Sequence, residues 1–544
     1  MIKGYTDKIT GNPLADAYLR GESKVQSLYH YKAGDTADLV TRVKDVDAYY
    51  QPKRRESLVQ ALRTYAARVT GVTSHTEALL DKFADSKALT VVTGQQAGLF
   101  TGPLYTLYKA VTAVAYADYY EKLLNRPVVP IFWVAAEDHD FQEVAEAFFI
   151  KDNGELYRSH LREQPFMRTP IGYHKIASEE IKRIVDELSI HLPEGMYREE
   201  LVSEIASSYL STENMVDGFV RLLSRWLQDY PILFVNPLDT QIRKLMSDAF
   251  RAVIERPADF QLAARQGEQA VRELGFVPQV ALVPTHTLIF TIEHGKRSAL
   301  DFDPETGIYT LRDSKRKISQ QELLGRLEER PQDFSAGVLF RPVTQDYLLP
   351  VLGYVGGAAE IAYHGMMKGI FIESERKIPP LLLRQRAFLL TSQVNRALER
   401  FQIKADDVLA GNVVFDRLLE RETKDLQLSL DSLKSCLLAE LADFQNTLVE
   451  LDVQLYRALA KTEFTISKGI DRLSNRARKS LLRKNQDIAT SAQVLESWIH
   501  PKAKEQERIL SPLSPLSKYG TLWLKDLWFD TPPAWEQIKC ITLE

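Results

Sequence analysis

The sequence predicts an α/β protein with a parallel sheet at its centre and a long helical segment in its C-terminal third. Short apolar runs, each ending abruptly in polar or glycine residues, recur through the first two thirds of the chain. Such runs, each followed by a helical pattern, are typical of parallel strands that are buried on both faces. Residues 413–468 contain neither Gly nor Pro, and their leucines recur every three or four positions, which indicates a coiled coil.

Length and composition exclude several classes of protein. At 544 residues the chain predicts more than one domain, and a hydrophobic content of 45% is ordinary for a soluble globular protein. A net charge of −4 gives no signal for nucleic acid or membrane binding. Cys436 and Cys540 build neither a disulfide framework nor a cysteine-based zinc site. The N-terminus has no apolar stretch of signal-peptide type, and we expect a cytoplasmic protein without a metal site.

Three parts are expected along the chain. Residues 1–384 would form the sheet-containing core, interrupted by insertions at about 150–222 and 300–335 where the alternation of strand and helix is lost. Residues 385–501 would form a helical antiparallel coiled-coil domain, and residues 502–544 a tail that packs back on the core.

The elements of the core are expected in this order. Helical stretches at 36–49 and 54–80 precede the first strand, 89–93, and a helix at 104–124 follows its glycine turn. Further parallel strands are predicted at 128–136, 231–235, 337–340 and 351–355. Residues 280–283 and 287–293 look like paired strands, and His294-Gly295 supplies a tight hairpin turn.

Five of these apolar runs end in polar or glycine residues, at Gly94, Glu137, Asn236, Arg341 and Gly356. Ligands bind at the carboxyl ends of the strands in parallel sheets. A structural sheet has no need to place Gln, His, Asp, Asn, Arg and Gly at one end, so the pattern favours a ligand crevice over ordinary loop chemistry.

The coiled-coil prediction depends on one apolar stripe. A single rod and an ordinary helical domain packed on the sheet are alternatives, but a hairpin that folds back near Asp452 lets two helices cover each other's stripe. Such hairpins often dimerise, so we expect a homodimer. The stripe consists of Leu426, Leu430, Leu433, Leu437, Leu441, Phe444, Leu448, Leu451, Leu455 and Leu459, continued by Ile466, Ile470, Leu473 and Ala477.

The turn after the first strand carries Gly94, Gly98 and Gly102 at intervals of four residues. This spacing matches neither the dinucleotide fingerprint nor a P-loop. It offers backbone N–H groups near a helix N-terminus, and the amides of Gln95 and Gln96 both donate and accept hydrogen bonds, which suits a polar or phosphorylated ligand. Solvent-facing glutamines on a tight turn are the alternative. Lys109 lies about one helical turn further on, where it contacts either a ligand or solvent.

The segment Glu137-Asp138-His139-Asp140 places three carboxylates around one imidazole. We expect the carboxylates to raise the pKa of His139 and favour the imidazolium, a good partner for phosphate or carboxylate. The spacing is too compressed for a tetrahedral metal site, and a capped helix start is the structural alternative.

Three further candidates lie later in the chain. Arg341 could clamp a carboxylate or phosphate through its guanidinium or form a structural salt bridge. Gly356 and Gly357 could bring backbone close to a ligand. A second pocket, a candidate cofactor site, could be formed by Lys518, Tyr519 and Gly520.

Four of these motifs closely resemble those of the bacillithiol biosynthesis BshC family of cysteine ligases. They are TGQQAGLFTGPLY at 93–105, FWVAAEDHDF at 132–141, RPVTQD at 341–346 and YVGG at 354–357. The resemblance covers essentially the whole chain, including the C-terminal helical part. One departure is Ala358-Ala359, where relatives have Pro-Gly.

The resemblance implies a Rossmann-type core with two connecting-peptide insertions and a coiled-coil dimerisation domain. It implies a reaction that joins L-cysteine to the amine of glucosaminyl malate and gives bacillithiol, the last step of that biosynthesis. ATP or ADP would be the nucleotide, since a carboxylate needs activation before an amine attacks it. With two distant cysteines the chain lacks the thiolates for a zinc site that recognises cysteine, so the thiol would be recognised another way.

We therefore predict an amide-forming ligase. His139 would stabilise negative charge, and Asp138 or Asp140 would orient it or accept a proton from the attacking ammonium. The alternatives are a nucleotidyl or glycosyl transferase on the same core, and a dimeric scaffold that senses a metabolite. The predicted substrate-binding residues are Thr93, Gly94, Gln95, Gln96, Tyr105, Lys109, Asn236, Arg341, Gly356 and Gly357.

Overall fold

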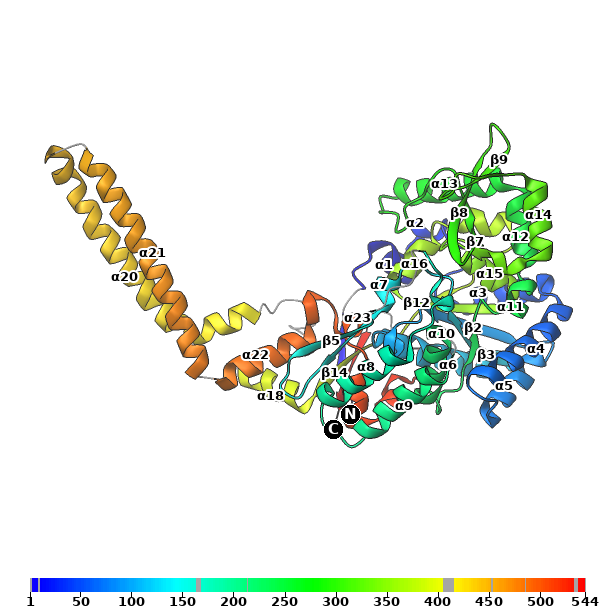
Figure 1. Ribbon diagram of the computed structural model, residues 1–544, viewed down its shortest axis with the longest axis horizontal. Helices are drawn as coiled ribbons and strands as arrows, with labels where there is room; N and C mark the ends of the chain where they lie inside the picture. The colour runs from blue at the N-terminus through cyan, green and yellow to red at the C-terminus, as the bar shows by residue number, and fades with distance from the viewer. Residues whose placement is uncertain are drawn as a thin grey trace. The chain divides into compact units, whose positions relative to one another are not determined.

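The computed structural model describes residues 2–7, 10–162, 168–212, 214–404, 415–451, 454–484, 486–532 and 537–543 (Figure 1). The chain divides into two compact units. The core unit comprises residues 1–151, 157–389 and 506–544, and the hairpin unit comprises residues 152–156 and 390–505. No helix among the residues described is long and apolar enough to cross a membrane.

A five-stranded parallel sheet forms the centre of the core unit, as the sequence predicts. β3 is buried along its whole length and β2 along its first five residues, which explains why both strands are continuous apolar runs. Neighbouring strands run in parallel register, with Thr93 beside Val355 on one side and Gln95 beside Val134 on the other. The order across the sheet is β13 (Leu381–Leu383), β12 (Val351–Gly356), β2 (Leu89–Gln95), β3 (Val128–Val134) and β6 (Leu233–Val235).

In the parallel sheet, one predicted strand is wrong and one real strand was missed. Residues 337–340 form a turn, closed by a hydrogen bond from Phe340 N to Gly337 O (3.0 Å), and Arg341 opens a helix instead of ending a strand. The fifth parallel strand is β13, an apolar run that follows two prolines and ends at Arg384. An apolar run of three or four residues fits a strand or a turn equally well, so periodicity cannot separate them.

Helices surround the sheet. α6 (Tyr105–Leu124) packs on β2 and β3 and is buried around most of its circumference. The predicted helical stretch at 54–80 is interrupted at residues 70–73, where Thr73 caps a new helix through a hydrogen bond from Thr76 N. The other helices of the N-terminal part are α1 (Pro13–Leu19), α2 (Ser23–Gln26), α3 (Thr36–Tyr49), α4 (Pro52–Val69) and α5 (Ser74–Ala84).

Two segments interrupt the strand–helix alternation, and both begin before the bounds predicted for the insertions, about 150–222 and 300–335. The first contains α7 (Phe141–Val144), the strand pair β4 (Glu146–Ile150) and β5 (Leu156–His160), α8 (Ser178–His191), α9 (Arg198–Leu210) and α10 (Met215–Trp226). The second follows α11 (Thr240–Leu245), α12 (Ser247–Glu255) and α13 (Pro257–Glu273). It is an antiparallel sheet of β10 (Lys317–Ile318), β9 (Ile308–Leu311), β8 (Lys296–Asp303), β7 (His286–Glu293) and β11 (Phe334–Ala336), with α14 (Gln320–Glu329).

The predicted hairpin in the second insertion is right at its turn and wrong in its first strand. β7 pairs with β8 through His294 and Gly295, both of which have positive φ (50° and 75°), as a tight two-residue turn requires. Residues 280–283 are not a strand, because β7 takes β8 and β11 as its neighbours and leaves no free edge for them.

The last elements of the core unit return to the sheet. They are α15 (Arg341–Leu348), α16 (Ala358–His364), α17 (Lys368–Glu373), α23 (Gln506–Ile509), α24 (Leu513–Tyr519) and β15 (Gln537–Leu543), which lies between β1 (Ile2–Asp7) and β14 (Arg386–Thr391). Leu104 N, just before α6, donates to Leu510 O (2.8 Å), and Ser511 N donates to Phe148 O (2.7 Å). These hydrogen bonds fix residues 510–511 beside the start of α6 and beside β4.

The hairpin unit contains α18 (Ser392–Phe401), α20 (Phe415–Leu451), α21 (Gln454–Lys484) and α22 (Gln486–Ile499). α20 and α21 run side by side and antiparallel (Figure 1), tied by Lys434 Nζ to Asp471 Oδ1 (2.7 Å) and by Ser474 Oγ to Gln427 (2.8 Å). The predicted helical hairpin is therefore confirmed, although Asp452 itself lies outside the described residues. Phe444, Leu448, Leu451 and Leu455 of the predicted stripe have no described side chains.

A buried ionic cluster attaches α3 to the sheet and to α15. The guanidinium of Arg42 is fully buried, forms an ion pair with Asp346 Oδ1, and donates through Nε to Val351 O (2.8 Å). Tyr49 OH donates to the other carboxylate oxygen of Asp346 (3.0 Å). Because α15 begins at Arg341, this cluster also sets the position of that residue.

We expect Asp346→Ala to lower the free energy of unfolding by about 3–5 kcal/mol, because the variant leaves the charge of Arg42 buried without its partner. Chemical denaturation followed by circular dichroism measures the change. The matched control is Asp118→Ala, which breaks the exposed pair between Asp118 and Lys122 and should leave the midpoint almost unmoved. Equal effects of the two substitutions would contradict the role assigned to the buried cluster.

Candidate active site

A cavity of about 460 Å³ opens at the carboxyl end of the parallel sheet. Four of the five strands contribute residues at or just after their ends, namely Gln95, Ala135, Gly357 and Arg384. Such a crevice is where parallel α/β sheets bind ligands. The predicted site residues that line this cavity are Gly94, Gln95, Gln96, Tyr105, Lys109, Asp138, Arg341 and Gly357.

The glycines of the first turn are required for close packing. A Cβ on Gly94 would lie 2.7 Å from Trp133 O, and one on Gly98 would lie 2.8 Å from Gly102 Cα. The N–H groups of the turn are used within the protein: Gly98 donates to Gln96 O (2.9 Å), Gly102 to Leu99 O (3.0 Å) and Phe100 to Tyr209 OH (3.1 Å). These backbone groups are not free to cradle an anion, so the turn presents its glutamine side chains to the cavity instead.

Lys109 is held by three acceptors. Its Nζ donates to Gly94 O (2.9 Å) and Gln95 Oε1 (3.0 Å) and pairs with Glu360 Oε2 (2.5 Å). An ammonium has three hydrogens, so these partners use all of them. Lys109 lines the cavity, yet it positions Gln95 and the sheet edge and keeps no donor for a ligand.

Glu360 completes this network from the other side. Its carboxylate accepts from Gly357 N (2.8 Å) and from Tyr354 OH (2.7 Å), in addition to pairing with Lys109. Burial raises the pKa of Glu360, but the charge of Lys109 and the N–H of Gly357 outweigh burial and hold that pKa below its ordinary value. The carboxylate therefore stays ionised and joins the ends of β2 and β12.

Gln96 joins two carboxylates at the rim. Its Nε2 donates to Asp138 Oδ2 (2.8 Å) and to Glu143 Oε2 (2.9 Å). Burial opposes ionisation of Asp138, but the charge of Arg341 and the hydrogen bond from Gln96 keep its pKa below the ordinary value. Asp138 is therefore a carboxylate that can accept a proton or a hydrogen bond from a ligand.

Arg341 lines the cavity without an ion-pair partner among the described residues, although its charge acts on Asp138. Among the described residues it forms no ion pair within 4.0 Å, and its Nε is buried without a hydrogen-bond partner. By contrast, Arg384 pairs with Glu507 at 2.5 Å. The structural salt bridge considered for Arg341 is absent from this part of the chain, which leaves its guanidinium free to bind an anion.

Three predicted substrate-binding residues lie outside the cavity wall. The Thr93 hydroxyl donates to Val355 O (2.8 Å) and joins β2 to β12. Asn236 is buried, and its side-chain oxygen accepts from Leu238 N (3.0 Å). Gly356 is packed against Tyr354 and Glu360, which a Cβ would approach to 3.0 and 3.1 Å. All three support the strand ends from within.

His139 and Asp140 also lie outside the cavity wall. Asp140 is exposed, and His139 is half-buried between Asp138 and the second insertion. The expected rise in the pKa of His139 is wrong: burial and the neighbouring charge of Arg297 lower it. Arg297 Nη1 lies 3.3 Å from His139 Nδ1, so this nitrogen accepts a hydrogen bond and the ring is neutral. Glu137 does not face the imidazole, because it pairs with buried Arg243 (2.7 Å).

The three C-terminal candidates meet the first insertion. Tyr197 N donates to Ser517 O (3.1 Å), and a Cβ on Gly195 would lie 2.6 Å from Lys518 Cα. A Cβ on Gly520 would meet the ring of Tyr197 at 3.0 Å. Lys518, Tyr519 and Gly520 are not among the residues that line the cavity.

The sequence alone did not assign a role to four charged residues of the cavity: Glu143, Glu360, Arg384 and Arg508. Arg384 ends a strand and follows the same pattern of apolar run and polar end that identified the others. Glu143 and Glu360 follow recognised motifs by a few residues. Arg508 lies more than one hundred residues further along the chain, and no local pattern connects it to the sheet.

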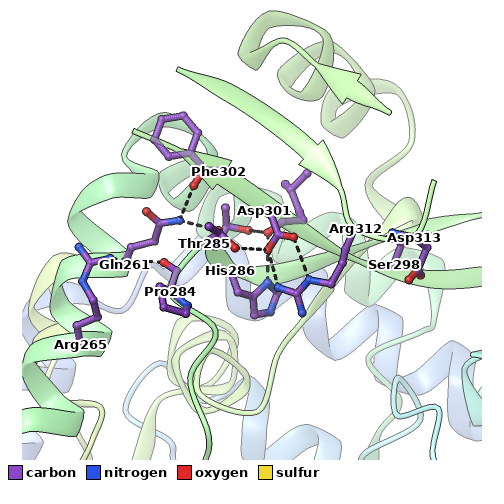
Figure 2. Close-up of polar contacts among 12 residues, drawn as sticks. Gln261, Arg265, Pro284, Thr285, His286, Ser298, Asp301, Phe302, Arg312 and Asp313 are labelled. Carbon is purple, nitrogen blue, oxygen red and sulfur yellow. Dashed lines mark hydrogen bonds and ion pairs between the residues drawn. The ribbon is translucent and has the colours of Figure 1, made fainter. Parts of the chain in front are cut away.

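A second cavity, of about 240 Å³, lies between α13 and the antiparallel sheet of the second insertion. Figure 2 shows the polar contacts of residues beside it. Its polar side chains are already engaged: Arg312 binds both oxygens of Asp301 (2.5 and 2.9 Å), and Gln261 Nε2 donates to Thr285 O (2.7 Å) and Phe302 O (3.1 Å). Burial lowers the pKa of His286 to about 4, so its ring is neutral. This cavity is lined mainly by apolar groups and is less suited to charged substrates.

Metal ligands do not gather in either place. Within the ranges that the structure covers, no group of three or more His, Cys, Asp or Glu side chains is arranged to hold an ion.

Comparison with known proteins identifies the family. Residues 2–385 match the model of the bacillithiol biosynthesis BshC N-terminal Rossmann-like domain, and residues 387–543 match that of the BshC C-terminal coiled-coil domain. Three similar proteins are each named "Putative cysteine ligase BshC". That of Salinibacter ruber is 30% identical over 88% of this chain and 87% of its own length, that of Heliobacterium modesticaldum 30% over 97% of each, and that of Geobacillus thermodenitrificans 29% over 93% of each.

The two domain models together span nearly all of the sequence, and the motifs that carry the family resemblance are the ones that build the cavity. The chain belongs to the BshC family of bacillithiol biosynthesis proteins.

Proposed function

We propose that this chain is a ligase that joins the carboxyl group of L-cysteine to the amine of glucosaminyl malate and so forms bacillithiol. The observation that carries the proposal is the 460 Å³ cavity, in which Arg341 has no ion-pair partner among the described residues and Asp138 is an ionised carboxylate. Amide formation requires these two kinds of group, one to hold a carboxylate and the other to take a proton from an amine.

In this proposal Arg341 binds the carboxylate or its activated form. The amine then attacks the carbonyl carbon, a C–N bond forms, and the activated oxygen leaves with its electron pair. Asp138 accepts the proton that the ammonium must lose, because it lines the cavity and Asp140 does not. His139 is a neutral neighbour of Asp138 and contributes no positive charge.

We also propose that ATP activates the carboxylate, because a free carboxylate does not react with an amine in water. We propose that the ligation takes place in the cytoplasm. The names of the relatives support a ligase that uses cysteine, and the architecture of the cavity supports a small substrate that carries both charges.

The direct test is mass spectrometry of the purified protein incubated with L-cysteine and glucosaminyl malate, with and without ATP. We expect the mass of bacillithiol to appear only when both substrates and the nucleotide are present. Product without ATP would refute the nucleotide step. Transfer of a nucleotidyl or glycosyl group instead of amide formation, or ligand binding without any product, would refute the ligase.

Arg341 gives the sharpest test of the site. We expect Arg341→Met to lower kcat/KM for ligation by about a hundredfold or more, because one charged donor to the reacting group is lost. The substitution breaks no ion pair within 4.0 Å among the described residues, so the variant should fold, and circular dichroism checks that it does. Arg341→Lys should recover part of the activity, because it keeps the charge and loses the planar fork.

The matched control for Arg341→Met is Arg272→Met. Arg272 is an exposed arginine on α13 that pairs with Glu268, and its loss should leave kcat/KM unchanged. A fully active Arg341→Met variant would place the reaction elsewhere.

The hairpin unit supports a homodimer, which we propose to form through the stripe of α20 and α21. Leu433, Leu437 and Leu473 are 46%, 39% and 51% exposed although they belong to this stripe. We expect the intact protein to sediment as a dimer, and the double variant Leu433→Glu, Leu437→Glu to sediment as a monomer, because charges cannot be buried cheaply at an apolar interface.

Leu262→Glu is the control for the sedimentation experiment. Leu262 lies on α13 of the core unit and is 48% exposed, so this variant should remain a dimer. A dimer that survives the double substitution in the hairpin would contradict the proposed interface.

A further inference from the structure

The side-chain amides of Gln95, the last residue of β2, and Gln96, which follows it, are held in opposite orientations by their hydrogen bonds. We infer that Gln95 presents N–H donors to the cavity and that Gln96 presents a carbonyl acceptor. The two side chains would then orient a substrate, with its carboxylate toward Gln95 and its ammonium toward Gln96. The inference rests on the proposed function, because it names the groups of the substrates that the same cavity selects.

The sense of Gln95 follows from Lys109. An ammonium can only donate, so the side-chain atom of Gln95 that lies 3.0 Å from Lys109 Nζ must be the oxygen. Nε2 of the same amide then donates one hydrogen to Tyr105 OH (3.1 Å), and its second hydrogen has no partner among the residues described. The amide cannot rotate by 180° without setting N–H against the ammonium.

Tyr105 extends this donor wall. Its oxygen accepts from Gln95, which leaves its own O–H to donate, and burial raises its pKa to about 12, so the hydroxyl keeps its proton. The guanidinium of Arg341 lines the same cavity. Gln95 and Tyr105 therefore offer N–H and O–H groups to an oxyanion such as a carboxylate or phosphate, and Arg341, whose charge also acts on Asp138, adds a cation to the cavity.

The sense of Gln96 follows from two carboxylates. Asp138 Oδ2 and Glu143 Oε2 accept, so the atom of Gln96 between them must be Nε2, and both of its hydrogens are used. The carbonyl oxygen of Gln96 has no hydrogen-bond partner in the described part of the chain. With Asp138 and Glu143 it forms a wall of acceptors, and a primary ammonium is the ligand group that such a wall binds.

The opposite senses explain how two neighbouring residues of one type can recognise different groups. A small molecule with a carboxylate and an ammonium would be oriented by the two walls, with its carboxylate toward Gln95 and its ammonium toward Gln96. L-Cysteine carries both groups, and the second substrate supplies an amine and two carboxylates, so either could provide the ammonium that Gln96 binds.

Binding of two truncated thiols separates the walls without any catalysis. Cysteamine has the ammonium and lacks the carboxylate, and 3-mercaptopropionate has the carboxylate and lacks the ammonium. Isothermal titration calorimetry with the full-length protein gives Kd for each. We expect Gln95→Met to weaken 3-mercaptopropionate by about tenfold or more and to spare cysteamine, and Gln96→Met to do the reverse, because each removes one hydrogen bond to a charged group.

Substitution by glutamate tests whether each side chain acts as a donor or as an acceptor toward the ligand. Glutamate offers only acceptors, so Gln95→Glu should weaken 3-mercaptopropionate at least as much as Gln95→Met does, whereas Gln96→Glu should not weaken cysteamine. The carboxylate that Gln95→Glu introduces can pair with Lys109, which favours correct folding, and circular dichroism checks each variant. Gln269→Glu, at an exposed position of α13, is the matched control and should leave both Kd values unchanged.

Several outcomes would overturn the inference. It is overturned if either methionine variant weakens the binding of both thiols equally, or if neither variant weakens any binding. It is also overturned if Gln95→Glu leaves the Kd of 3-mercaptopropionate unchanged, or if the wild-type protein binds neither thiol. D-Glucosamine and L-malate, titrated in the same way, distinguish the two sources of ammonium and carboxylate. Selective binding without any bacillithiol formation would refute the proposed ligase and leave the two walls in place.

Discussion

The buried ion pair between Lys109 and Glu360 organises the candidate site. Burial of two opposite charges is favourable only when good geometry and further hydrogen bonds compensate for lost hydration. Both groups meet this condition by binding the ends of strands: Lys109 holds Gly94 O on β2, and Glu360 holds Gly357 N beyond β12. The pair thereby fixes the distance between two neighbouring strand ends and leaves a cavity between α6 and α16.

The same pair gives the cavity its polarity. Because Lys109 donates its third hydrogen to the side-chain oxygen of Gln95, the N–H groups of that amide are directed toward the cavity. On the other side of the strand end, Asp138 and Glu143 fix Gln96 in the opposite sense. The cavity therefore has the donors of Gln95 and Tyr105 in one group and the acceptors of Gln96, Asp138 and Glu143 in another, and the charge of Arg341 acts on Asp138. This arrangement suits the carboxylate and the ammonium that amide formation brings together.

The sequence predicted the residues of the cavity wall that depend on local pattern. The strands that end at Gly94 and Glu137 are buried on both faces, so their apolar runs were long enough to recognise, and the polar residues after them were found with them. The strand before Arg384 and the turn before Arg341 are each only three or four apolar residues long. Periodicity cannot show that one is a strand and the other a turn. The helical hairpin was predictable because the spacing of three or four residues between apolar positions recurs many times along the stripe.

The electrostatics could not be predicted in the same way. The sequence suggested that neighbouring carboxylates would raise the pKa of His139, but Glu137 turns away to Arg243, and Arg297 arrives from the antiparallel sheet to lower it. Lys109 looked like a ligand contact until its three acceptors were placed around it. A charge is controlled by the groups that the fold brings within a few ångströms, and most of these lie far away in the sequence.

The most direct measurement is a crystal structure of the protein with L-cysteine and glucosaminyl malate soaked together in the absence of ATP. Our account predicts both molecules in the cavity between α6 and α16, with a carboxylate at Arg341 and Gln95 and an amine within hydrogen-bonding distance of Asp138. Both substrates bound elsewhere, with Arg341 and Asp138 facing only water, would contradict it.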